Sequence, residues 1–92
     1  MKLTKADSSN IDGTNFSPDG EEDLGTLTIR FKGTVKQPGP VYQYRVTEKM
    51  AQDFFEADSL GRFFNTTIRP LVSALRLDPE KWDDYPVDED EG

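Results

Sequence analysis

Two short runs of alternating residues set the strongest constraint on how this chain folds. They are TLTIRF at residues 26–31 and VYQYRV at residues 41–46. Apolar and polar residues alternate in both runs, which is the period-two pattern of a half-buried strand. The intervening GTVKQPGP is rich in glycine and proline, so it predicts a turn and makes the pair a β-hairpin. Two strands alone are marginal in water, so we expect a third strand, with residues 9–16 as a weaker candidate.

Two helices are expected after the hairpin. Thr47 is a good N-cap because its hydroxyl can accept from backbone N–H groups two or three residues ahead. Ser59 is in the same position relative to a second helix. The apolar residues that share one helical face are Met50, Phe54 and Ala57 in the first helix, and Leu60, Phe64, Ile68, Leu71 and Leu75 in the second. These stripes predict helices that pack on the sheet.

Pro70 interrupts the second helical pattern. Proline removes a helix hydrogen bond and disfavours helical geometry in the residue before it. The helix therefore either kinks there or ends, with residues 71–77 in a separate turn. We predict an α+β fold with a short antiparallel sheet of about three strands followed by two helices. Residues 1–8 are expected to be flexible, residues 9–77 to form the domain, and residues 78–92 to be a disordered acidic tail.

The charge distribution is uneven along the chain. Its formal net charge of −7 divides into −4 for residues 1–23, +4 for residues 24–77 and −7 for residues 78–92. A basic centre between two acidic ends keeps a nucleic-acid partner among the candidates, although the whole chain is acidic.

The composition excludes several kinds of chemistry. The chain has no cysteine and no histidine, so it can form neither disulfides nor Cys/His zinc sites nor Ser-His or Cys-His catalytic pairs. It also lacks a P-loop motif and EF-hand spacing. We predict a non-enzymatic protein without cofactor or metal. Neither a signal peptide nor a membrane-spanning run is recognisable, so we expect a soluble, cytoplasmic protein.

Two motifs, in this order, resemble the KTSC domain family. Tyr42 and Tyr44 match its Y-x-Y motif, and residues 59–69 match its S-x-G-[KR]-[FY]-F-N-x-x-I-R signature. The resemblance covers roughly residues 8–70. The family is named after the C-terminal extension of some lysyl-tRNA synthetases and includes stand-alone bacterial and phage proteins. The resemblance implies a compact β-rich domain with helices, and it makes RNA a candidate ligand.

Three groups of residues are candidates for nucleic-acid binding. Tyr42 and Tyr44 point to one face of their strand, where they would either stack on bases or pack in the core. The opposite face of the hairpin carries Arg30, Lys32 and Arg45, as either a phosphate-binding surface or an ordinary solvated face. The second helix carries basic residues seven positions apart, which form either an anion-binding ridge or the charged side of an amphipathic helix. These residues are Arg62, Arg69 and Arg76.

The acidic tail contains Trp82 and Tyr85 among its carboxylates. Three roles are compatible with this composition. The tail docks on a partner protein, or it folds back on the basic centre and competes with nucleic acid, or it only keeps the chain in solution. Our leading hypothesis is a small accessory module that binds RNA or single-stranded DNA, with a tail that inhibits binding. The alternative is a protein-interaction module that acts through the tail or the same basic surface, for example a phage-encoded modulator of a host protein.

Overall fold

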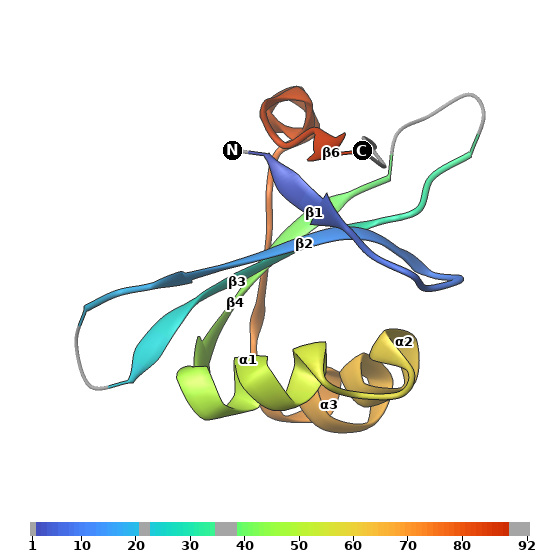
Figure 1. Ribbon diagram of the computed structural model, residues 1–92. Coiled ribbons are helices and arrows are strands. Elements are labelled where there is room, and N and C mark those ends of the chain that lie inside the picture. The colour runs from blue at the N-terminus through green and yellow to red at the C-terminus, as the bar shows by residue number, and fades with distance from the viewer. Residues whose placement is uncertain (1, 21–22, 35–38, 89–92) are drawn as a thin grey trace.

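The computed structural model describes residues 2–20, 23–34 and 39–88. Figure 1 shows a twisted sheet with the helices of residues 48–71 on one side and a 3-10 helix at residues 79–84 on the other. The described residues form a six-stranded mixed sheet in the order β5-β4-β3-β2-β1-β6. Its strands are β1 (Leu3–Lys5), β2 (Ile11–Pro18), β3 (Leu24–Phe31), β4 (Val41–Thr47), β5 (Ala74–Arg76) and β6 (Val87–Asp88). The α+β class is consistent with the prediction, but the expected sheet of about three antiparallel strands with two helices is wrong.

The centre of the sheet is the predicted hairpin with one strand added. β3 and β4 pair antiparallel, with Leu27 opposite Tyr44 and Ile29 opposite Tyr42, and β2 pairs antiparallel with β3. Part of the predicted turn, residues 35–38, lies outside the described residues. At its end Gly39 approaches Phe31 so closely that a Cβ atom would lie 1.5 Å from the Phe31 carbonyl oxygen. Only glycine is compatible with this approach.

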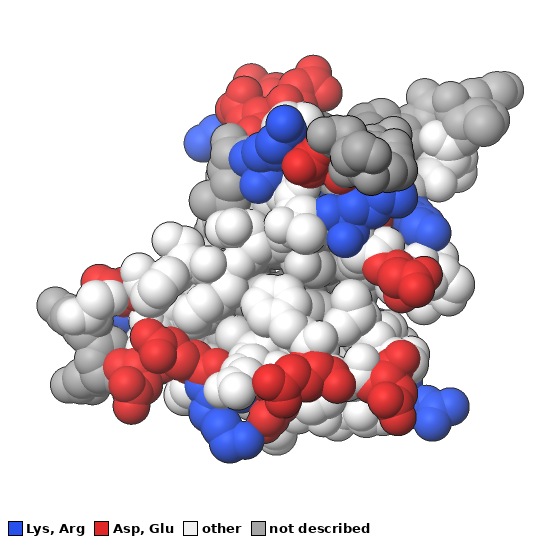
Figure 2. Space-filling model, viewed as in Figure 1, with Lys and Arg blue, Asp and Glu red and all other residues white. Residues whose placement is uncertain are grey.

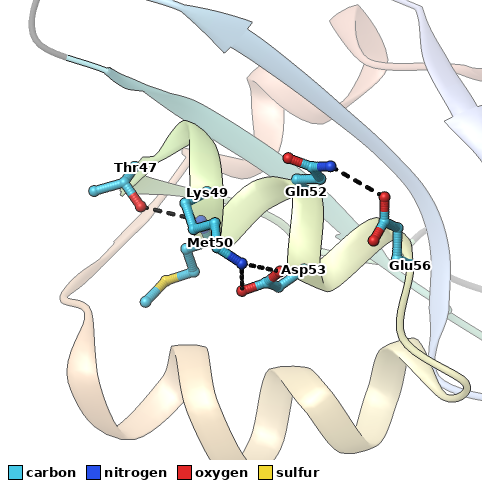
Figure 3. A network of polar contacts seen from close by, with 6 residues as sticks. All are labelled: Thr47, Lys49, Met50, Gln52, Asp53 and Glu56. Carbon is cyan, nitrogen blue, oxygen red and sulfur yellow. Dashed lines mark hydrogen bonds and ion pairs between the residues drawn. The ribbon is translucent and has the colours of Figure 1, made fainter.

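The first helix begins where its cap predicts. In α1 (Glu48–Phe55) the Thr47 hydroxyl accepts a hydrogen bond from the Met50 N–H at 3.0 Å, as Figure 3 shows. The exposed side of α1 carries i,i+4 pairs between Lys49 and Asp53 and between Gln52 and Glu56. Its other side buries Ala51 and Phe54 against the sheet.

The second helical segment is continuous through Pro70 but changes its pitch before it. It comprises α2 (Leu60–Phe63), the π-helical turn η1 (Phe64–Ile68) and α3 (Arg69–Leu71), and the Ser59 hydroxyl caps its start. In a regular α-helix the Pro70 ring would clash with the carbonyl of Thr66. We attribute the wider π turn to this conflict.

The helical segment ends earlier than the apolar stripe predicts. Val72 is already extended, with φ −125° and ψ 132°. Leu71 and Leu75, which the stripe placed on the buried face, are 72% and 61% exposed. The prediction is wrong for Leu75 because residues 74–76 pair with β4 as strand β5 instead of continuing the helix. Leu71 still lies in α3, but the wider π turn before it changes the face of the helix on which Leu71 falls.

Both faces of the central strand β3 are covered, so Leu27, Thr28, Ile29 and Arg30 are all buried. Leu27 and Ile29 belong to the main core, where the helices contribute Phe54, Phe64 and Ile68. We call the opposite face, to which Thr28 and Arg30 belong by alternation, the back face of the sheet.

The back face is covered by the C-terminal strap, which we define as residues 72–88. The strap pairs with β4 through β5 at one edge of the sheet and with β1 through β6 at the other. Between these strands it forms a 3-10 helix, η2 (Pro79–Asp84). In Figure 1 the orange and red part of the chain passes behind the central strands before it reaches β6. The strap therefore spans the whole sheet.

Trp82 is the buried aromatic residue of the strap. It is 9% exposed, its Nε1–H donates to the Leu77 carbonyl at 2.8 Å, and the Arg76 guanidinium lies 5.4 Å from its ring centroid. The prediction of a disordered tail is therefore wrong for residues 78–88, and residues 89–92 of that tail lie outside the described residues. Its like charges indicated disorder, but the aromatic and aliphatic residues between them bury enough apolar surface to hold the segment in place.

The prediction of a flexible N-terminus at residues 1–8 is also wrong for the part of this segment that the structure describes. Leu3 is fully buried in β1, pairs with Val87 of β6, and its backbone N–H donates to the Pro86 carbonyl. A Cβ atom on Gly13 would lie 2.8 Å from Val87 Cγ2 and 3.0 Å from Leu3 Cβ. This close packing explains why so short a strand is ordered: the strap and β2 hold it from both sides.

Candidate functional site

A pocket of about 640 Å³ opens between the helix-bearing face of the sheet and the second helical segment. Tyr42 and Tyr44 of β4 lie on its sheet side, and Gly61, Asn65 and Arg69 lie on its helical side. These residues come from the two motifs on which the family resemblance depends. The fold therefore brings together two segments that are about twenty residues apart in the chain.

The wall of the pocket is aromatic. The Phe31 ring makes edge-to-face contacts with Tyr42 at 5.6 Å and with Phe64 at 5.2 Å between centroids, and Tyr44 contacts Phe64 at 5.4 Å. Tyr44 is 4% exposed and belongs to the main core, whereas Tyr42 is half-buried. Of the two alternatives for these tyrosines, core packing therefore describes Tyr44, and Tyr42 keeps part of its surface open to a ligand.

Polar groups converge on this aromatic wall. Asn10, Asn65 and Arg69 line the pocket, and Arg69 is the only charged side chain among the described lining residues. The pKa of Tyr44 is raised to about 12, chiefly by burial and also by the neighbouring Tyr42, while the Arg69 cation partly opposes the shift. Tyr44 therefore keeps its proton at neutral pH and remains a hydrogen-bond donor.

The π turn orients the helical side of the pocket. The Arg69 N–H donates to the Phe64 carbonyl, five residues earlier, across η1. In an α-helix, residues five positions apart point in clearly different directions, because each residue turns the chain by about 100°. The wider turn reduces this divergence and lets Phe64, Asn65 and Arg69 line the same pocket.

Gly61 is the residue whose functional meaning the sequence does not reveal. Its φ is not positive, because Gly20 is the only glycine with positive φ in the described part of the chain. A Cβ atom at Gly61 would meet Asn10 Nδ2 at 3.5 Å and Ser8 Oγ at 3.6 Å, which are ordinary contacts. Glycine in a helix costs about 1 kcal/mol relative to alanine. Neither backbone nor packing requires that cost, and the missing side chain widens the pocket.

The predicted basic face is not an open surface. Arg30 is 9% exposed, and its Nη1 donates to the carbonyls of Trp82 and Tyr85 in the strap, both at 2.9 Å. The expectation that Arg30 faces outward is wrong because the strap covers the back face. Lys32 is exposed, and Arg45 is exposed but forms an ion pair with Asp19.

The predicted arginine ridge is also divided. Arg62 is exposed on the second helical segment, Arg69 lines the pocket, and Arg76 lies in β5 opposite Tyr42. The ridge required a helix that continues to residue 76, and the chain leaves the helix at Val72. Trp82 and Tyr85, proposed as partner-binding residues, belong to the strap, where Trp82 is buried and Tyr85 is half-buried.

Within residues 2–20, 23–34 and 39–88, there is no group of three or more acidic, histidine or cysteine residues that could hold a metal ion. In the same part of the chain, every helix is too short or too polar to cross a membrane.

Comparison with known proteins identifies a family and a similar fold. The KTSC domain model matches residues 7–71, which include both motifs of the pocket but end before the strap. A crystal structure of a KTSC domain protein from Yersinia pestis is similar, with a TM-score of 0.64 and 31% sequence identity over 79% of this chain and 92% of that chain. No curated protein matches this sequence. The match over most of the chain shows that this protein belongs to the KTSC domain family.

Proposed function

We propose that this protein binds single-stranded nucleic acid, with RNA as the first candidate, and that the pocket receives one unstacked nucleotide. The convergence of the two motifs on one open pocket is the observation that carries the proposal. Single-stranded bases are bound by stacking on aromatic rings and by hydrogen bonds to their edges. Tyr42 offers the ring surface, and Asn10 and Asn65 offer the amides.

Arg69 is the proposed phosphate contact. Its planar guanidinium binds phosphate oxygens in pairs, and the Tyr44 hydroxyl beside it is a further donor. Each phosphate neutralised in a single strand contributes about −0.7 to the slope of log K against log salt. Because Arg30 is buried, we expect a slope between about −0.7 and −2, much shallower than an open basic face would give.

In this proposal the strap restricts nucleic-acid binding to the pocket. Two of its carbonyls accept hydrogen bonds from the Arg30 guanidinium, so the back face offers little to a phosphate backbone. Removal of residues 78–92 is not a clean test of inhibition, because it would also uncover Leu3 and Val41, which are fully buried. Single substitutions at the pocket are the better test. Capture of a partner through Trp82 would first require the strap to detach.

The test is fluorescence anisotropy with labelled eight-nucleotide RNA and DNA at two salt concentrations. Loss of one hydrogen-bonded contact to a charged group costs about 1.5–3 kcal/mol, so Arg69→Gln should weaken binding about tenfold or more. Lys49→Gln removes the same charge from the exposed side of α1, away from the pocket, and should leave binding within about twofold. Absence of binding at low salt, or equal losses in the two variants, would refute the proposal.

Gly61→Ala separates binding from folding. The new methyl group makes ordinary contacts, so stability should rise by about 0.5–1 kcal/mol as glycine leaves a helix. The same methyl group narrows the pocket, so binding should weaken. Urea denaturation and anisotropy on one preparation measure the two effects. A variant that is more stable and binds equally well would show that the pocket is not the binding site.

A further inference from the structure

A second concave surface lies where β1 and β2 meet the junction of α1 and α2. It is a groove of about 570 Å³, and its lining includes the apolar residues Ala6, Phe16, Phe55 and Leu60. Phe55 is 44% exposed, so part of its side chain is open to solvent in this groove. Phe16, another lining residue, is half-buried. The groove shares no lining residue with the pocket around Arg69.

The charges around this groove are predominantly negative. Asp7 follows β1 and Asp58 follows α1, and both are exposed and line the groove. Lys5 also lines it, but its Nζ lies 3.6 Å from Asp12 Oδ1, so a carboxylate accompanies the one cation. The last turn of α1 carries no basic residue, so no side chain of the helix offsets the negative C-terminal end of the helix dipole. Figure 2 shows several groups of acidic side chains, with basic side chains between them, along the helical side of the molecule below a broad uncharged area.

We propose that this groove binds an arginine side chain presented by an extended segment of a partner protein. A guanidinium can stack on the exposed Phe55 ring while its N–H groups reach carboxylates, a combination that lysine cannot make with the same planar geometry. Asp58 supplies one carboxylate of the groove lining at the helix junction, and Asp7 supplies another on the strand side. The apolar lining accommodates an aliphatic residue beside the arginine.

The probe is acetyl-Leu-Arg-Leu-amide, compared with the same peptide carrying citrulline, which has the shape of arginine without its charge. An exposed cation–π contact and surface ion pairs each contribute little affinity, so we expect a dissociation constant in the millimolar range. In ¹H–¹⁵N spectra of the full chain, amide shifts should centre on Ala6, Asp7, Ala57 and Asp58. The citrulline peptide should bind at least fivefold more weakly.

Three variants test the assignment. Asp58→Asn and Phe55→Leu change exposed groups, so both should fold and both should weaken the arginine peptide about threefold or more. Asp83→Asn removes an equal charge from η2 in the strap and should leave its affinity unchanged. Equal weakening by Asp83→Asn, equal binding of the citrulline peptide, or no shifts at 10 mM peptide would overturn the proposal. Concentration-dependent shifts at the same amides without peptide would identify a second copy of this chain as the occupant instead.

Discussion

Trp82→Ala is the most informative perturbation of this fold, because one residue reports on the whole strap. The indole is 9% exposed and its N–H is bonded to the Leu77 carbonyl at 2.8 Å. Truncation of a buried tryptophan to alanine costs about 3–5 kcal/mol. Domains of this kind are stable by about 5–15 kcal/mol in total, so the variant should lose a large fraction of its stability. Its melting temperature should fall by roughly 15 °C or more.

This loss of stability is expected only if the strap unfolds together with the rest of the domain. Leu3, Val41 and Arg30 are buried on the back face, so the sheet cannot keep its full packing if the strap leaves. Trp82 is the only tryptophan in the chain, so its fluorescence measures strap docking directly in the unmodified protein. We therefore expect tryptophan emission and far-UV circular dichroism to change at the same urea concentration.

The control is Leu75→Ala, in the same strap. Leu75 is 61% exposed, so this variant should lose less than about 1 kcal/mol. The reasoning is wrong if Trp82→Ala also loses less than about 1 kcal/mol. It is equally wrong if the emission changes at clearly lower urea than the dichroism, since the strap would then be a detachable appendage.

Three further predictions follow from individual contacts. Arg30→Met leaves two strap carbonyls without their donor and should reduce the free energy of unfolding by about 2–4 kcal/mol in urea, whereas Lys32→Met should stay within about 0.5 kcal/mol. Tyr44 has a pKa raised to about 12 in the folded state, above the value near 10 of an unfolded chain, so the stability linked to its proton is complete below about pH 10 and is lost as pH rises towards 12. Denaturation at several alkaline pH values should therefore show a smaller decline for Tyr44→Phe than for the unmodified protein; equal declines would contradict the assignment. Gly39→Ala places a Cβ atom 1.5 Å from a backbone oxygen of β3, so thermal melts should show a loss of at least about 3 kcal/mol, and a change below 1 kcal/mol would mean that the hairpin end is differently built.

The parts of the fold that were predictable are those with a local signal. Alternation over residues 26–31 and 41–46 predicts β3 and β4, and the Thr47 and Ser59 hydroxyls mark the helix starts that the structure shows. Strands β1, β5 and β6 have two or three residues each, too few for a periodic pattern. They are strands because neighbouring edges supply hydrogen-bond partners, and this is tertiary information.

The candidate site was predictable only in part, for a related reason. The motifs identified Tyr42, Tyr44 and Arg69 as members, but no pattern shows that they share one pocket, which depends on the π turn and on where the helix crosses the sheet. Gly61 carries no signal, because a glycine that opens a pocket and a glycine in a turn are identical in sequence. Arg30 was misplaced because alternation assigns it to a face but cannot show that a distant segment covers that face.

The pairing of β1 with β6 has a consequence for how the chain reaches this structure. Leu3 is opposite Val87, so the first and last strands are neighbours, and almost the entire chain lies between them. Contacts this distant in sequence slow folding, because a large loop must close before they form. During synthesis β1 has no β6 partner until residues 87–88 have been made. The pairing of β1 with β6 should therefore form after the rest of the sheet, and the edge of β1 would be open to other strands until then.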